Sequence, residues 1–261
     1  MKPHSFHTLR FNRAASHYEE AAGVQARMAV RLLALHPGGA APSQIVEFGC
    51  GTGLLTRGLR ARYPDAFILA TDAAERMLES SRLSTQQNGS VPLHFSLQDG
   101  SGETPHSETL RKHRPFDLLA SNALVQWFPD LAGHLGFAAK LAKPGSLYLL
   151  SGFSHSNFPE LNALLREPPF SYQGFPGHNP GVIPTVGKEN GWSVLKIEAW
   201  EEKEIHPSSL DVLRKIQTLG SARDPRKGGR LNQPSAVGVC ACGRDHRFER
   251  SIATSERPAF R

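Results

Sequence analysis

Short apolar runs alternate with amphipathic stretches along residues 44–151, and this alternation predicts a parallel β-sheet covered by helices on both faces. The predicted strands are 44–48, 66–71, 93–97, 116–121 and 146–151. The predicted intervening helices are 54–62, 73–81 and 130–142, whereas 101–114 is expected to form a polar loop. The fold class is therefore α/β, with a doubly wound and mostly parallel sheet.

The segments that flank this alternation are less regular. Before it, apolar residues recur at steps of three and four, which predicts amphipathic helices that end at Pro37-Gly38-Gly39. After residue 152 proline is frequent, and a helix is expected only at 160–166. A sixth strand is expected at 192–205 and a helix at 208–219, with Ser208 or Ser209 as its N-cap. Beyond Ser221 the sequence indicates no element.

These patterns divide the chain into three expected parts. Residues 1–152 form a core with N-terminal lid helices, 153–220 form a cap or substrate segment with late sheet elements, and 221–261 form a poorly ordered basic tail. The net charge of +6 resides almost entirely in that tail, which holds nine basic and four acidic residues. Because the remaining residues are nearly balanced, we expect no nucleic-acid partner.

Composition narrows the setting further. No apolar run reaches 18 residues and the N-terminal stretch lacks an apolar core, so neither a membrane span nor a secretory signal is expected. Three cysteines, Cys50, Cys240 and Cys242, are too few for a disulfide scaffold and indicate a reducing, cytoplasmic compartment. Cys240 and Cys242 have no matching pair, and the histidines are scattered, so no metal site is expected. We expect a monomer.

The strongest chemical signal is Glu47-Phe-Gly49-Cys-Gly51-Thr-Gly53, directly after the first predicted strand. Alternate glycines allow a ligand to approach the backbone closely. The spacing does not match the dinucleotide-binding fingerprint G-x-G-x-x-G/A from either glycine. An acid before the loop suits a ligand with a positively charged, amino-acid-like end. The alternative is a tight strand–helix turn without a ligand.

Two further acids end the next two predicted strands. Asp72 follows Gly53 by 19 residues, where a carboxylate can accept both hydroxyls of a ribose, although it can equally cap the following helix. Asp99 can accept the exocyclic amine of adenine, although Asp99-Gly100 is also a simple turn signal. Since ligands bind at the carboxyl ends of strands in open α/β sheets, the joint occurrence of these acids favours a nucleoside-containing ligand.

With these motifs, residues 43–151 resemble the class I S-adenosylmethionine-dependent methyltransferases, whose fold is Rossmann-like. The resemblance implies that Glu47 and the loop Gly49–Gly53 hold the methionine portion of S-adenosylmethionine, Asp72 the ribose and Asp99 the adenine. The remaining residues that we assign to the cofactor site are Gln25, Cys50, Ala73, Met77, Gly100 and Asn122.

A narrower resemblance lies outside that core. The stretches 10–29 and 121–131, which includes Gln126 and Trp127, resemble the malonyl-acyl-carrier-protein O-methyltransferases of biotin synthesis, and weaker similarities occur at 158–161 and 209–220. This resemblance implies malonyl-acyl carrier protein or malonyl-CoA as the substrate. The chain departs from the family after Gly220, where members carry a longer segment ending in an apolar strand that closes the sheet.

The sequence indicates fewer residues for binding the methyl-accepting carboxylate than for binding the cofactor. A carboxylate is already a nucleophile at neutral pH, so no strong general base is required, and catalysis depends mainly on alignment and exclusion of water. By resemblance Tyr18 orients the acceptor carboxylate, with Gln126 and Trp127 beside it; Tyr18 can instead be a packed ring of a lid helix. Arg166, Arg214 and Lys215 are candidate partners of the carboxylate.

Two other functions remain open at this point. One is methylation of another small carboxylate or metabolite. The other is a non-catalytic cofactor-binding module.

Overall fold

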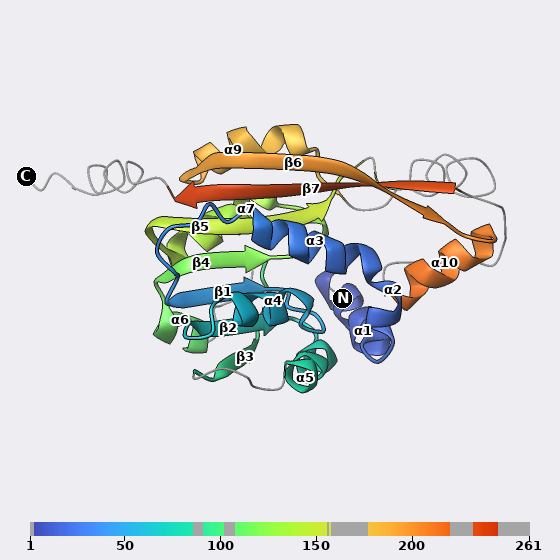
Figure 1. The fold of residues 1–261 in the computed structure, drawn as a ribbon, viewed down its shortest axis with the longest axis horizontal. Helices are drawn as coiled ribbons and strands as arrows, with labels where there is room; N and C mark the ends of the chain where they lie inside the picture. The colour runs from blue at the N-terminus through green and yellow to red at the C-terminus, as the bar shows by residue number, and fades with distance from the viewer. Residues whose placement is uncertain are drawn as a thin grey trace, which may run out of the picture.

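The computed structural model describes residues 3–85, 91–101, 108–155, 157, 177–219 and 232–244. Strands and helices alternate through most of them (Figure 1). The elements are α1 (Pro3–Ala14), α2 (Tyr18–Ala21), α3 (Gly23–Ala34), β1 (Gln44–Phe48), α4 (Leu54–Arg62), β2 (Phe67–Asp72), α5 (Glu75–Ser84), β3 (Leu93–Leu97), α6 (Glu108–His113), β4 (Phe116–Ser121), η1 (Val125–Trp127), α7 (Leu131–Leu141), β5 (Ala142–Phe153), η2 (Pro180–Val182), α9 (Ile183–Glu189), β6 (Trp192–Ile205), α10 (Ser209–Thr218) and β7 (Asn232–Arg244).

The strands form a seven-stranded sheet in the order β3-β2-β1-β4-β5-β7-β6. Neighbours among β1 to β5 are parallel, while β7 runs antiparallel to both β5 and β6. The strand order reverses between β1 and β4, which is the topological switch point where open α/β sheets bind ligands. The predicted doubly wound, mostly parallel sheet is confirmed.

Alternating side chains divide the core into two layers. On β1, Ile45 packs with α3 and α4 on one face of the sheet, whereas Val46 packs with α7 on the other. On β5 the same alternation sends Leu149 to the first face and Leu150 to the second. Because neighbouring positions on these strands are fully or almost fully buried, each strand reads as a continuous apolar run in the sequence.

The N-terminal helices lie at the end of the sheet where β1, β2 and β4 finish (Figure 1). Helix α1 packs along α5 through a small cluster that contains Ala14, Ala15, Ala74 and Met77. Helix α10 returns the late part of the chain to this region, where Leu219, just after α10, packs on Ala21 and Ala22. The lid therefore touches both the early and the late halves of the chain.

The predicted strands all occur, with small shifts at their ends. Ser208 caps α10 as one of the two predicted candidates, because its Oγ accepts from the Asp211 N–H at 3.3 Å. The prediction that 101–114 is a loop was wrong over 108–113, which forms α6. This helix carries few apolar residues, but it buries Leu110 completely beneath the sheet.

The prediction of no element beyond Ser221 was also wrong, because 232–244 forms β7. This strand lies between two others, pairing Leu150 with Cys240 on one side and Ile197 with Cys240 on the other. Backbone pairing with two neighbours supplies order that small residues and glycines do not indicate in the sequence. The predicted helix at 160–166 and the rest of the expected tail lie outside the described residues.

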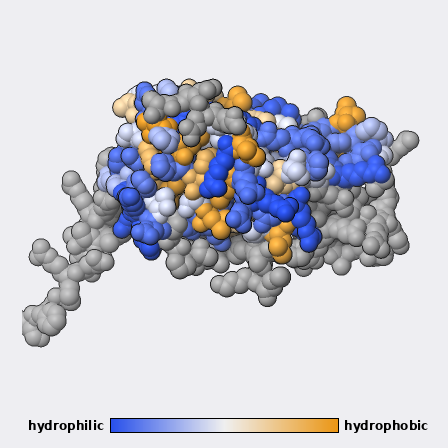
Figure 2. Space-filling model, turned by 90° about the horizontal axis from the view of Figure 1, so that it is seen from below, coloured by the Kyte–Doolittle hydropathy of each residue, from blue (hydrophilic) through white to orange (hydrophobic). Residues whose placement is uncertain are grey.

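The surface around the β3 edge mixes polar and apolar residues. Figure 2, which views the molecule from below, shows orange patches separated by blue ones among the coloured residues. Leu97 on β3 and Leu83 on α5 are among the large exposed apolar side chains. Within the described residues, no helix is long and apolar enough to cross a membrane.

Candidate active site

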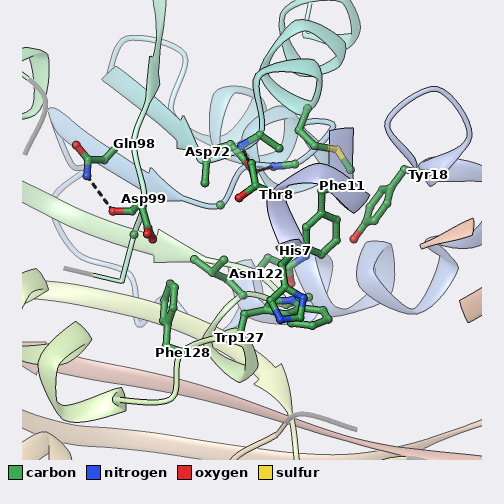
Figure 3. A pocket seen from close by; sticks show the side chains of 18 residues that line it. His7, Thr8, Phe11, Tyr18, Asp72, Gln98, Asp99, Asn122, Trp127 and Phe128 are labelled. Carbon is green, nitrogen blue, oxygen red and sulfur yellow. Dashed lines mark hydrogen bonds between the residues drawn. The ribbon is translucent and has the colours of Figure 1, made fainter. Parts of the chain in front are cut away.

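A cavity lies where the lid helices meet the carboxyl ends of β1 to β4. Figure 3 shows side chains from α1 and α2 facing, across this cavity, the acids at the carboxyl ends of β2 and β3. Residues 49–51, 72–77, 98–100 and 122–128 contribute most of the sheet side, and 7–18 contribute the lid side. The lining residues are His7, Thr8, Phe11, Tyr18, Gly49, Gly51, Asp72, Ala73, Ala74, Met77, Gln98, Asp99, Gly100, Asn122, Ala123, Leu124, Trp127 and Phe128.

The glycine loop has left-handed backbone at each of its glycines, with φ of 64° at Gly49, 55° at Gly51 and 94° at Gly53. A β-carbon at Gly49 would lie 2.6 Å from a methyl carbon of Leu124. By contrast, a β-carbon at Gly51 would meet no heavy atom within 4 Å. Gly51 therefore leaves a stretch of bare backbone facing open space, as close approach by a ligand requires.

Asp72 ends β2, and both of its carboxylate oxygens accept backbone hydrogen bonds. Oδ2 accepts from the Gly51 N–H at 2.9 Å, and Oδ1 accepts from the Ala74 N–H at 2.8 Å. Burial raises the pKa of this carboxyl to about 6, while the N–H groups around it act in the opposite direction. Helix α5 begins at Glu75 with Ala74 as its N-cap, so Asp72 is not the helix cap. The Ala73 N–H also acts on this carboxyl, and because a carboxylate offers about four acceptor positions, at least one remains for a ligand.

Asp99 follows β3 in a tight turn. Its Oδ1 accepts from the Ser101 N–H at 2.9 Å, and its carbonyl oxygen accepts from Gln98 Nε2 at 2.9 Å (Figure 3). Both the turn interpretation and the ligand interpretation are therefore compatible with this residue. Because Oδ1 is held by the turn, Asp99 presents its carboxylate to the cavity in a fixed direction.

The lid closes the other side of the cavity with aromatic rings. The His7 ring lies 4.8 Å from that of Trp127, and the Phe11 ring meets Trp127 edge-on at 5.4 Å. Tyr18 stands further along the lid, and burial raises the pKa of its phenol above the ordinary value, with the charges of Asp72 and Glu19 adding to the effect. Its hydroxyl therefore remains protonated at neutral pH and can donate.

Most of the predicted site residues meet at this cavity. Those that line it are Tyr18, Gly49, Gly51, Asp72, Ala73, Met77, Asp99, Gly100, Asn122 and Trp127. Five others are not in its lining, namely Gln25, Glu47, Cys50, Gly53 and Gln126.

Glu47 points away from the cavity because strand alternation places it on the α4 face of the sheet. It is almost completely buried, and its Oε2 accepts from Thr56 Oγ1 at 2.7 Å. Burial raises the pKa of Glu47 to about 8, although the hydrogen bond from Thr56 lowers it. Glu47 thus ties β1 to the first turn of α4 beneath the glycine loop.

The other four residues outside the lining, Gln25, Cys50, Gly53 and Gln126, make contacts in the segments around the cavity. The Cys50 side chain packs with Ala70 and Leu78, and burial raises the pKa of its thiol. Gly53 is the left-handed N-cap of α4.

Two side-chain amides, those of Gln126 and Asn122, make hydrogen bonds that stabilise the loop after β4. The Gln126 amide Nε2 donates to the Ala123 carbonyl at 2.6 Å. Gln25 contributes its backbone carbonyl, which accepts from Asn122 Nδ2 at 3.0 Å and so links the lid to the β4 end.

Sequence reasoning missed several lining residues. His7 and Thr8 precede the stretch 10–29 that carried the family resemblance, Phe11 lies within it, and Gln98, Leu124 and Phe128 lie close to residues that were identified. The four-residue spacing of His7 and Phe11 places both on one helical face and was an available signal.

Two of the cationic residues that were predicted as partners of the acceptor carboxylate form ion pairs away from the cavity. Arg214 pairs with Asp211 at 3.2 Å, and Lys215 pairs with Glu204 at 2.6 Å. Neither lines the cavity, while Arg166 lies outside the described residues.

Comparison with known proteins agrees with this geometry. A family described as a methyltransferase domain matches residues 46–148. A malonyl-[acyl-carrier protein] O-methyltransferase of Dechloromonas aromatica is 28% identical over 211 residues, which cover 81% of this chain and 74% of that protein. One from Acetivibrio thermocellus is 34% identical over 166 residues, covering 63% of this chain and 53% of that protein.

Solved structures give the same fold. A putative methyltransferase from Bacillus halodurans superposes with a TM-score of 0.61 at 14% identity and covers 83% of this chain and 98% of its own. Magnesium protoporphyrin IX methyltransferase from Synechocystis, with bound S-adenosylhomocysteine, gives a TM-score of 0.55 at 16% identity over 86% of this chain and 84% of its own.

The sheet order, the glycine loop and the acids at the strand ends, together with these matches, make the chain an S-adenosylmethionine-dependent methyltransferase of the class I fold. Within that class, its sequence is similar to the malonyl-[acyl-carrier protein] O-methyltransferases.

Proposed function

We propose that this enzyme methylates the free carboxylate of a malonyl thioester, carried by acyl carrier protein, in biotin synthesis. The observation that carries the proposal is the combination of a cofactor-type cavity, closed by the N-terminal helices, with similarity to a malonyl-[acyl-carrier protein] O-methyltransferase over 81% of the chain. A similar protein from Bordetella avium, named as a biotin biosynthesis bifunctional protein, is 29% identical over 84% of this chain.

The cavity suits the proposed cofactor. Asp72 and Asp99 each keep carboxylate acceptor positions, which fit the hydroxyls of a ribose and the amine of adenine respectively. The open space at Gly51 fits the close approach of the methionine portion. S-adenosylmethionine supplies a methyl group made electrophilic by its positively charged sulfonium.

The residues of this chain then have to align the acceptor and keep water out. Tyr18 donates a hydrogen bond to the acceptor carboxylate, which its protonated phenol allows. Trp127, His7 and Phe11 form the aromatic wall that excludes water from the reacting groups. Because the carboxylate is ionised before it binds, no residue has to remove a proton from it.

The test is methyl-ester formation by the purified protein with S-adenosylmethionine and three acceptors: malonyl-acyl carrier protein, malonyl-CoA and free diacids. We expect the carrier-protein thioester to be esterified most efficiently. Ester formation only on free diacids would replace the proposal with a small-carboxylate methyltransferase. Binding of S-adenosylhomocysteine without any methylated product would indicate a non-catalytic module.

A further inference from the structure

A chain of buried hydrogen bonds lies under the cavity, and none of the roles above uses it. His134 on α7 is completely buried. Its Nδ1 lies 2.6 Å from the Gly100 carbonyl oxygen, and its Nε2 lies 2.6 Å from the Tyr148 hydroxyl. The Tyr148 hydroxyl lies 3.1 Å from Ser121 Oγ. The turn after β3, the end of β4, α7 and β5 therefore meet in one chain of polar groups within the core.

Chemistry fixes the direction of these hydrogen bonds. A carbonyl oxygen can only accept, so His134 donates to Gly100 through Nδ1. Burial lowers the pKa of His134 to about 4, and the ring is therefore neutral at physiological pH. With its proton on Nδ1, the ring accepts from the Tyr148 hydroxyl at Nε2, and Tyr148 in turn accepts from Ser121.

The Gly100 carbonyl and the Ser101 N–H belong to the same planar peptide group. His134 holds the carbonyl end of this group, and the N–H end donates to Asp99 Oδ1 at 2.9 Å. Rotation of the peptide would break both contacts together. The direction of the Asp99 carboxylate thus depends on the orientation of a peptide that His134 anchors.

The ring itself is held firmly. Phe128 packs against it at 4.6 Å and Phe48 meets it edge-on at 5.7 Å. Phe128 also lines the cavity, and its ring lies 3.4 Å from where a β-carbon on Gly100 would be. An apolar residue of similar volume would fill this space equally well, so packing alone does not account for a histidine that carries two short hydrogen bonds.

We propose that His134 is a positioning residue for adenine recognition, because it anchors the Gly100–Ser101 peptide and thereby aims Asp99 at the exocyclic amine. The inference rests on the adenine role proposed for Asp99. It goes beyond that role in assigning the selectivity for adenine to a side chain that does not touch the cofactor.

The experiment compares the affinities of S-adenosylhomocysteine and S-inosylhomocysteine, which carries an oxygen in place of the adenine amine. Calorimetry on the full chain gives the ratio of the two dissociation constants. We expect the unmodified protein to favour S-adenosylhomocysteine by on the order of tenfold, as one charge-assisted hydrogen bond would give. His134→Phe keeps a ring but loses the donor, and its ratio should fall towards one.

Two variants separate positioning from packing. His134→Asn places an amide N–H near the position of Nδ1 and should restore most of the ratio, whereas His134→Gln presents its amide nearer to Nε2 and should not. The matched control is Ser146→Ala on β5, which removes another buried hydrogen bond, to the Phe116 carbonyl at 2.6 Å. It should lower stability without changing the ratio.

The outcomes are distinct. An unchanged ratio in His134→Phe, or equal weakening of both ligands, makes His134 a packing residue and overturns the inference alone. Should His134→Phe fail to fold, equal ratios in the Asn and Gln variants overturn it in the same way. If the unmodified protein does not distinguish the two ligands, the adenine role of Asp99 falls, and this inference with it. None of these results bears on the identity of the methyl acceptor.

Discussion

Asp72 Oδ2 accepts a hydrogen bond from the Gly51 N–H at 2.9 Å, which joins the end of β2 to the glycine loop that follows β1. The two motifs are 21 residues apart in the chain but form one surface of the cavity. The carboxylate that is proposed to bind the ribose therefore also fixes the loop that is proposed to hold the methionine portion. Changes at either residue are expected to affect the same ligand.

Replacing Asp72 tests the ribose role. Asp72→Ala should weaken S-adenosylmethionine binding by about 1–3 kcal/mol, because the ribose hydroxyls lose charge-assisted partners and the Gly51 N–H loses its acceptor. Asp72→Asn keeps an oxygen acceptor but not the charge, so its affinity for S-adenosylmethionine should lie between those of the unmodified protein and Asp72→Ala. Calorimetry measures the affinities; wild-type affinity in a folded Asp72→Ala protein would rule the ribose role out.

The same carboxyl predicts a pH dependence. Because the pKa of Asp72 is about 6, lowering the pH through 6 protonates it and removes the charged acceptor, so S-adenosylmethionine affinity should fall below pH 6. In Asp72→Asn this loss should be absent over the same interval. A parallel decline in both proteins would assign the titration to another group.

Replacing Gly51 tests whether the cofactor occupies the open space in front of the glycine loop. Gly51→Val should abolish measurable cofactor binding, because a β-branched side chain would enter the open space in front of the loop and resist a φ of 55°. Gly38→Val is the matched control, since Gly38 has a φ of 85° and equally open surroundings but does not line the cavity. Both should lower the melting temperature, and only the first should lose binding. Retained binding in Gly51→Val would mean that the loop does not approach the cofactor.

The raised pKa of Glu47 predicts that the stability of the folded protein depends on pH. Its folded pKa of about 8 exceeds its ordinary value, so the folded state binds the proton more tightly and loses stability as pH rises from about 4.5 to 8. Glu47→Gln keeps an oxygen for the Thr56 hydroxyl without the buried charge. Thermal unfolding should therefore show the variant more stable than the parent at pH 8–9, and little different at pH 5. A constant difference across this range would contradict the raised pKa.

Tyr18→Phe tests the acceptor role. The variant keeps the ring in the lid but removes the donor, so cofactor affinity should hardly change while the single-turnover methyl-transfer rate falls by about 5- to 150-fold. Tyr63→Phe is the control, because Tyr63 is buried at the end of α4 and does not line the cavity. A wild-type rate would leave Tyr18 as a packing residue, and an equal loss of cofactor affinity would place its hydroxyl on S-adenosylmethionine.

The sequence by itself determined the succession of strands from 44 to 151, the helices between them except α6, and the positions of the glycine loop and the acids at the strand ends. Apolar runs and glycine signals are local, and the carboxyl ends of parallel strands always meet at one edge of the sheet. For that reason the glycine loop, Asp72 and Asp99 could be assigned to one site before the fold was known. The resemblance to a family added Tyr18 and Trp127, which also line the cavity.

Only the tertiary structure decided which face each side chain takes and what covers it. Glu47 reads as part of the binding motif, but strand alternation turns it to Thr56, on the α4 face of the sheet. The docking of α1 brings His7 to Trp127, and the packing of α7 brings His134 under Gly100. β7 likewise depends on neighbours on both sides rather than on its own residues. Contacts between segments far apart in sequence have no local pattern, because long-range packing and backbone pairing select them.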